Sequence, residues 1–196
     1  MKFVIGIDEA GRGPLAGPVA VGVVAAEHSF DILAAFPGLN DSKKLSEKKR
    51  EVLFALLELH IEKGNVRARV CMSSAKTIDT KGISYSVSAA LGEALLDVMP
   101  DTSGGIVYLD GSLKAPASYQ QETIIGGDGK IPTIMLASVA AKVTRDRLMT
   151  VLAEEEPRYG FEKHKGYGTA SHIQAIREHG VSPLHRLSFL SRVLSH

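Results

Sequence analysis

The chain opens with two runs of apolar residues of the kind that form β-strands. Residues 3–7 and 19–24 are rich in β-branched side chains. The segment 10–18 between them contains several glycines and prolines, which end strands and favour turns. The pattern therefore predicts two strands that are joined by a tight loop.

A helix and a third strand are predicted next. Apolar side chains recur at helical spacing over residues 52–61. Ser46 before this stretch is a residue type that caps helix N-termini, and Gly64 after it is a residue type that ends helices. Residues 66–72 alternate between apolar and polar positions, which is the period of a half-buried strand.

Helical and strand patterns alternate through the rest of the chain. Helices are expected over residues 84–99, 133–155, 169–178 and 184–194, short strands over residues 106–109 and 122–125, and a loop over residues 159–168. This alternation predicts an α/β fold with a mixed sheet. We expect a single domain over residues 1–196, in which about 157–196 form a helical C-terminal extension.

The composition excludes several classes of protein. Hydrophobic residues make up 44% of the chain and charged residues 23%, which excludes a disordered chain, a collagen-like fibre and a coiled coil. The apolar runs are too short for a signal peptide or for the roughly 20 residues of a membrane span. The single cysteine, Cys71, cannot form an internal disulfide. We therefore expect a cytoplasmic protein without a membrane partner.

Charge is balanced in total but not along the chain. The formal net charge is +1, which gives no overall field to attract nucleic acid. Basic residues nevertheless gather in two groups. In most proteins, groups of this kind are only solvated surface. The first group is Lys43, Lys44, Lys48, Lys49 and Arg50, and the second is Lys142, Arg145, Lys163, Lys165 and Arg186.

Carboxylates stand at the ends of apolar strands or in turns. Asp8 and Glu9 follow the first predicted strand, Asp110 follows another, and Asp128 lies between two glycines. Ligand sites gather at strand ends in α/β sheets. Converging carboxylates repel one another, so the arrangement makes physical sense chiefly if a divalent cation lies among them. Oxygen ligands favour Mg²⁺ or Mn²⁺ over zinc as that cation. A turn-capping role is the alternative for each residue taken alone. Asp8 and Glu9 can both approach one cation only if the strand ends there, because neighbouring strand residues face opposite ways.

Gly11 and Gly13 flank Arg12 in the loop after the first strand. Glycines allow backbone amides to approach a phosphate or sugar closely, and Arg12 can add a charge-assisted contact. A dinucleotide-binding motif is excluded, because Pro14 and a second strand follow where that motif requires a helix.

Five segments of the chain resemble the signature motifs of bacterial ribonuclease HII. They occur in the expected order over nearly the whole chain, as GIDEAGRGP at 6–14, DSKKL at 41–45, DG at 110–111, ASVAAKVTRD at 137–146 and HKGYG at 164–168. The resemblance implies an RNase H-like fold, with a mixed five-stranded sheet flanked by helices and a small helical C-terminal extension.

The resemblance also implies which carboxylates act in catalysis. They are Asp8, Glu9, Asp110 and Asp128, which would bind two divalent ions, Mg²⁺ or Mn²⁺. Asp146 is a rival for the fourth position, but an ion pair within its predicted helix is a sufficient explanation for it.

Substrate contacts are implied for three further groups of residues. Gly11, Arg12 and Gly13 match the family segment that recognises the 2′-hydroxyl of a ribonucleotide, which distinguishes RNA from DNA. Tyr167 matches the tyrosine that packs on the neighbouring sugar. The lysines that fall in matched motifs are expected to contact phosphates, and they are Lys43, Lys142 and Lys165.

The implied activity is that of an endoribonuclease. It would hydrolyse the RNA strand of RNA–DNA hybrids and cut 5′ of ribonucleotides embedded in duplex DNA, leaving 3′-hydroxyl and 5′-phosphate ends. Ribonuclease HIII is an alternative, but it usually carries an extra N-terminal domain and Gly-Lys-Gly, whereas this chain begins on its first predicted strand and has Arg12. A non-catalytic nucleic-acid-binding module is a second alternative, which loss of a carboxylate would favour, and none is lost. We expect a monomer, and because residues 189–196 show no clear clamp-binding peptide, a clamp partner stays open.

Overall fold

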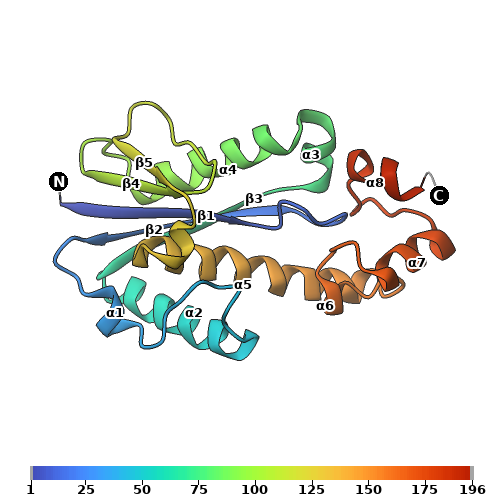
Figure 1. The fold of residues 1–196 in the computed structure, drawn as a ribbon, viewed down its shortest axis with the longest axis horizontal. Helices are drawn as coiled ribbons and strands as arrows, with labels where there is room; N and C mark the ends of the chain where they lie inside the picture. The colour runs from blue at the N-terminus through green and yellow to red at the C-terminus, as the bar shows by residue number, and fades with distance from the viewer. Residues whose placement is uncertain (1, 195–196) are drawn as a thin grey trace.

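A mixed five-stranded sheet forms the centre of the protein in the computed structural model, which describes residues 2–194 (Figure 1). The strand order is β3-β2-β1-β4-β5. The strands are β1 (Phe3–Ala10), β2 (Val19–Glu27), β3 (Val66–Ser73), β4 (Gly105–Asp110) and β5 (Gln121–Ile124). β2 runs antiparallel to β1 and β3, whereas β1, β4 and β5 are parallel. All of the strands expected from the sequence are present, and the expected mixed sheet is confirmed.

The helices cover both faces of the sheet. They are α1 (Ile32–Ala35), α2 (Glu47–Glu62), α3 (Ala75–Lys81), α4 (Ile83–Val98), α5 (Pro132–Glu155), α6 (Phe161–His164), α7 (Ala170–His179) and α8 (Leu187–Leu194), with a 3₁₀ turn η1 (Gly127–Gly129). α4 packs on one face, and α5 with α2 packs on the other (Figure 1). Because both faces are covered, β2 is buried along nearly its whole length, which explains its continuous apolar sequence.

The caps explain where the predicted helices begin. The Ser46 hydroxyl accepts a hydrogen bond from the Lys49 amide at the start of α2. Thr169 does the same for the His172 amide at the start of α7. Both N-termini agree with the expected positions.

Three short helices are absent from the sequence-based prediction. α1, α3 and α6 contain four to seven residues, which is too short for a hydrophobic period to emerge. α6 lies in the segment 159–168 that was expected to be a loop. α8 begins at Leu187, three residues later than predicted, since Ser182 and His185 form a hydrogen-bonded turn before it.

The C-terminal helices α6, α7 and α8 gather at one end of the sheet (Figure 1). They share an apolar cluster with the end of α5 and with the loop after β1, to which Leu15, Met149, Phe161 and Leu190 contribute. Residues 195 and 196, at the end of the segment considered for a clamp-binding peptide, lie outside the described residues. Among residues 2–194, no helix combines the length and the hydrophobicity that a bilayer-spanning segment requires.

Candidate active site

Three aspartates from three different elements converge at one edge of the sheet. Asp8 lies on β1, Asp110 ends β4, and Asp128 lies in η1 just before α5. One carboxylate oxygen from each lies within 4.8 Å of the other two. The parallel pairing of β1 with β4, which runs to Ile7 and Leu109, brings the first two together. We call Asp8, Asp110 and Asp128 the acidic cluster.

The acidic cluster is a costly arrangement of negative charge. Burial raises the pKa of Asp8 to about 7, and the charges of Glu9 and Asp110 add to the effect. Hydrogen bonds from the Ser138 hydroxyl and from the Glu9 amide, at 2.8 Å, oppose it. Buried carboxylate oxygens that repel one another in this way fit a divalent cation, which would remove the repulsion.

Glu9 lies outside the group of converging oxygens. The sequence allowed Asp8 and Glu9 to approach one cation only if the strand ended there, and β1 instead stays paired with β2 through Ala10. Neighbouring strand residues face opposite sides of the sheet, so Asp8 and Glu9 are separated. Glu9 Oε1 lies 3.3 Å from Arg12 Nη1. Burial raises the pKa of Glu9, the charge and hydrogen bond of Arg12 oppose the rise, and the charge of Asp110 adds to it.

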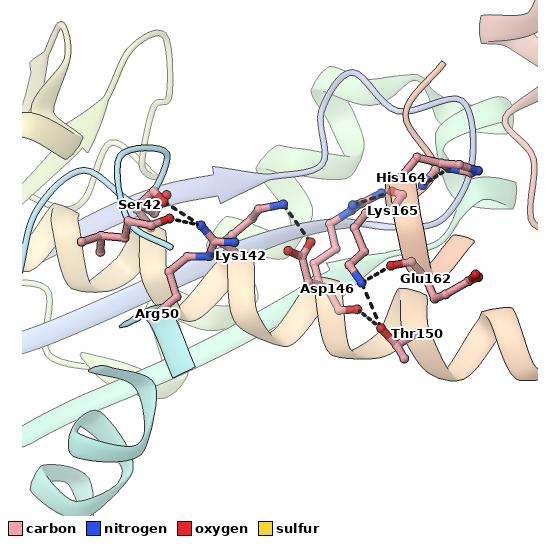
Figure 2. A network of polar contacts seen from close by, with 12 residues as sticks. Ser42, Arg50, Lys142, Asp146, Thr150, Glu162, His164 and Lys165 are labelled. Carbon is pink, nitrogen blue, oxygen red and sulfur yellow. Dashed lines mark hydrogen bonds and ion pairs between the residues drawn. The ribbon is translucent and has the colours of Figure 1, made fainter. Parts of the chain in front are cut away.

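Asp128 and Asp146 occupy different surroundings. The Lys43 ammonium lies 2.8 Å from Asp128 Oδ2, whereas Asp146 accepts a hydrogen bond from Lys142, also on α5, at 2.9 Å (Figure 2). An ion pair for Asp146 within its helix was predicted, and its partner is Lys142 rather than the neighbouring Arg145. Asp128 belongs to the acidic cluster, and Asp146 does not.

The loop that carries Lys43 is fastened from two sides. Ser42 is buried, and its hydroxyl lies 2.7 Å from the Ser138 hydroxyl on α5. Arg50 Nη1 donates hydrogen bonds to the carbonyls of Ser42 and Leu45 (Figure 2). Ser42, Arg50 and Ser138 are not among the site residues expected from the sequence, although Ser42 and Ser138 stand in the motifs quoted for it.

The glycine loop, by which we mean residues Gly11 to Gly13 after β1, is tightly packed at one end and open at the other. Gly11 has a φ of +83°, and a Cβ placed there would lie 1.9 Å from Arg145 Nε. A Cβ placed at Gly13 would meet nothing within 4 Å. Only Gly11 is therefore required for packing, and the backbone at Gly13 is accessible to a ligand.

Two arginines that were expected on the surface are fully buried. Arg145 and Arg186 each have 0% exposure, so these two members of the second basic group do not lie on the surface, whereas Lys163 does, with 83% of its side chain exposed. Arg145 donates to the carbonyls of Ala16, Pro18 and Lys165. Burial and the charge of Arg145 lower the pKa of Arg186 to about 9, which leaves it charged at neutral pH. No sequence pattern identifies an arginine as buried in this way, because its partners are backbone carbonyls that are distant in the sequence.

Tyr167 and Lys165 lie at the start of the C-terminal region. The Tyr167 side chain is exposed, and its ring centroid lies 5.9 Å from Lys142 Nζ. Lys165 has a φ of 51°, and its ammonium binds Thr150 Oγ1 and the Glu162 carbonyl (Figure 2). Lys43 thus lies beside the acidic cluster, and Lys142 lies beside Tyr167. The Lys165 ammonium is instead bound to residues of α5 and α6.

Three buried histidines support the segment before Tyr167 and the segment after it. His164 and His172 stack with ring centroids 4.4 Å apart. His172 Nδ1 lies 2.9 Å from the Tyr167 carbonyl, and its Nε2 lies 3.1 Å from His185 Nε2. Because a carbonyl only accepts, His172 donates from Nδ1, and His185 therefore donates from Nε2 to His172. Neutral rings satisfy this chain of hydrogen bonds.

Comparisons with a family profile, with individual proteins and with solved structures indicate the same family. A family profile described as Ribonuclease HII matches residues 5–192. Ribonuclease HII of Endomicrobium trichonymphae is 46% identical over 187 residues, which cover 95% of this chain and 84% of the relative. Ribonuclease HII of Bacillus anthracis is 44% identical over 190 residues, which cover 96% of this chain and 69% of the relative.

Solved structures agree with the fold. The ribonuclease HII of Archaeoglobus fulgidus, solved as a complex with PCNA, matches with a TM-score of 0.75 and 25% identity over 94% of each chain. Ribonuclease H2 from Pyrococcus horikoshii OT3 matches with a TM-score of 0.73 and 22% identity over 99% of this chain and all of the other, which supports the fold alone. The expected RNase H-like fold is confirmed, and the chain belongs to the ribonuclease HII family of metal-dependent endoribonucleases that act on RNA–DNA hybrids.

Proposed function

We propose that this chain cuts on the 5′ side of ribonucleotides embedded in duplex DNA, as well as within the RNA strand of hybrids, and leaves 3′-hydroxyl and 5′-phosphate ends. One observation carries the proposal. The oxygens of the acidic cluster lie within 4.8 Å of one another, and its member Asp8 lies on β1, the strand that leads directly into a glycine loop open at Gly13. The proposed catalytic site and the proposed site for recognition of the ribose are therefore adjacent along the chain.

Asp8, Asp110 and Asp128 would hold the divalent ions. Glu9, which faces away from the cluster but is affected by the charge of Asp110, would join them by a movement of its side chain when the ions bind. Oxygen ligands of this type suit Mg²⁺ or Mn²⁺. Two such ions would supply an activated water and stabilisation of the leaving 3′ oxygen in an in-line displacement. Asp8 would help to hold both ions, because it is buried and the charges of both Glu9 and Asp110 act on it. Asp128 is assigned to the nucleophile side, and Glu9 and Asp110 to the leaving-group side.

The remaining residues would bind and orient the substrate. Gly11, Arg12 and Gly13 would read the 2′-hydroxyl, chiefly through backbone groups, and Tyr167 would pack on the neighbouring sugar. Exposure of Tyr167 supports its assignment. The lysines proposed to contact phosphates are Lys43, Lys142 and Lys165, of which the last is supported by its motif alone, because its ammonium binds Thr150 and Glu162.

We also propose that residues 1–196 act as one catalytic unit, with about 157–196 as its extension, and as a monomer in the cytoplasm. Arg186 supports the first part, because it reaches back from the extension to the carbonyls of Gly11 and Arg12. The free, buried Cys71 is consistent with a reducing compartment.

The test is a cleavage assay on an end-labelled duplex that carries a single ribonucleotide, with Mg²⁺, Mn²⁺ or a chelator. We expect one cut on the 5′ side of the ribonucleotide with either metal and no cut with the chelator. Asp8→Asn should lower the rate by at least about 1,000-fold and leave binding of the duplex largely intact. Asp146→Asn is the matched control, and its rate should stay within about threefold of the parent. A cut on the 3′ side, or full cleavage by Asp8→Asn, would refute the proposal.

A further inference from the structure

Arg186 makes an unusual set of contacts for a charged residue. It is fully buried, and its guanidinium donates to three backbone carbonyls rather than to a carboxylate. The distances are 2.7 Å to Gly11 O, 2.9 Å to Arg12 O and 2.9 Å to Gly17 O. Arg186, which lies between α7 and α8, thereby binds the carbonyls of two consecutive peptide groups of the glycine loop from the interior of the protein.

These contacts fix which way the two peptide groups face. In a trans peptide the carbonyl and the amide N–H point in opposite directions. The Gly11 carbonyl shares its peptide with the Arg12 N–H, and the Arg12 carbonyl shares its peptide with the Gly13 N–H. Because both carbonyls turn inward to Arg186, both amides turn outward.

The outward side of the loop is free to receive a ligand. Neither the Arg12 amide nor the Gly13 amide donates a hydrogen bond to any group within the part of the chain that the structure describes. A Cβ at Gly13 would meet nothing within 4 Å. Consecutive outward amides form a concave donor site for an oxygen atom.

We propose that Arg186 is a positioning residue that holds the Arg12 and Gly13 amides outward as a pair of donors to the 2′-oxygen of the ribonucleotide. The inference rests on the proposed function, in which this loop reads the 2′-hydroxyl. The planar guanidinium suits the task, because its fixed fork of donors spans two adjacent carbonyls, whereas the single ammonium of lysine does not hold them in one plane.

Asp79 provides a matched control for the loss of three hydrogen bonds near Arg186. Its carboxylate accepts from the amides of Leu187 and Ser188 and from the Ser188 hydroxyl, at 2.6 to 2.9 Å. It therefore fastens the residues that follow Arg186 without a hydrogen bond to the glycine loop. Asp79→Ala should therefore loosen this segment without removing a hydrogen bond to the carbonyls of the loop.

The experiment compares binding of two duplexes in an Asp8→Asn background with Mg²⁺. One duplex contains a single ribonucleotide, and the other has the same sequence in DNA alone. We expect Arg186→Lys to lower the ratio of the two affinities by about tenfold or more, with affinity for the all-DNA duplex within about twofold of the parent. Asp79→Ala should keep the parental ratio.

The outcomes separate this inference from the proposed function. If the parent discriminates between the duplexes and Arg186→Lys retains the full ratio, the role of Arg186 is refuted and the proposed function stands. If Asp79→Ala lowers the ratio as much as Arg186→Lys, general loosening explains the loss and the inference is overturned. If the parent itself does not discriminate, the reading of the 2′-hydroxyl is refuted and the inference falls with it.

A second measurement needs no substitution of Arg186, so it decides the matter even if Arg186→Lys does not fold. In ¹⁵N-labelled Asp8→Asn protein, the Arg12 and Gly13 amides should exchange quickly with solvent, and the Arg186 Nε–H should exchange slowly. The ribonucleotide duplex should slow the exchange of both amides, and the all-DNA duplex should not. Slow exchange of these amides in the free protein would mean that they already have partners, which would overturn the inference.

Discussion

The ammonium of Lys43 lies 2.8 Å from the carboxylate of Asp128, and the two side chains differ sharply in burial, at 76% and 8% exposure. The hydrogen bond to Asp128 raises the pKa of Lys43, so the lysine stays charged. The chain thus supplies a positive charge at the point where three carboxylates converge. A divalent ion at Asp128 would compete with that ammonium, and a displaced Lys43 would become available to a phosphate, as proposed for this lysine.

Replacing Lys43 should therefore separate metal binding from substrate binding. We expect Lys43→Ala to bind Mn²⁺ more tightly, by about two- to fivefold, because a competing cation is lost. The same variant should have a KM about tenfold higher, because a phosphate contact is lost. Titration calorimetry with Mn²⁺ and steady-state cleavage would measure the two effects. Lys44→Ala is the control, since Lys44 lies near Asp41 and not Asp128, and tighter Mn²⁺ binding by both variants would contradict the explanation.

Much of the fold was predictable because its signals are local. β1 and β2 are buried on both faces, so their apolar runs stand out, and the caps at Ser46 and Thr169 mark helix starts. The carboxylates at strand ends were predictable for the same reason. The separation of Asp8 from Glu9 follows from the alternation of a strand, but it required knowing that β1 continues to Ala10.

The supports of the site were not predictable, because they join residues that are far apart in the sequence. Arg145 and Arg186 were assigned to a basic surface group, yet both are buried against backbone carbonyls. Backbone acceptors exist at every position, so sequence carries no sign of which one an arginine will bind. The net charge of +1 is likewise a poor guide to binding, since the sum includes buried arginines together with an acidic cluster of which Asp8 and Asp128 are buried.

The two glycines of the loop should respond differently to the same substitution. Gly11→Ala places a Cβ 1.9 Å from Arg145 Nε at a φ of +83°, so we expect a loss of about 2 kcal/mol or more of folding free energy. Gly13→Ala meets nothing within 4 Å, so its stability should change by less than about 0.5 kcal/mol. Its methyl group would instead obstruct the approach of a sugar and raise KM. Urea unfolding and cleavage kinetics test the pair, and equal stability losses would contradict the assignment of packing to Gly11.

Tyr167 should matter for selectivity more than for folding. Its side chain is 43% exposed, so Tyr167→Ala removes little buried surface, and its stability should fall by less than about 1 kcal/mol. Loss of packing on a sugar should lower the preference for a DNA–RNA–DNA junction over a continuous hybrid by about five- to tenfold. Tyr85→Ala is the matched control, because Tyr85 is 49% exposed on α4. Unchanged junction preference in Tyr167→Ala would refute the role assigned to this residue.

His172 should make the free energy of unfolding depend on pH between about 6.5 and 4. Burial lowers the pKa of His172 to about 4 from 6.5, so below pH 6.5 the unfolded chain binds a proton that the folded chain does not. The contribution of His172 to the free energy of unfolding is at its maximum above pH 6.5. It falls by about 3 kcal/mol as the pH drops to 4 and then levels off. Asp8, with its raised pKa, contributes with the opposite sign, because its buried carboxylate costs more as the pH rises towards 7. The comparison is therefore between the parent and His172→Gln, which share Asp8, by urea unfolding at several pH values. We expect His172→Gln to lose less stability than the parent on acidification and His28→Gln, at an exposed site, to follow the parent. An equal loss in His172→Gln and the parent would show that the buried histidine does not carry this pH dependence.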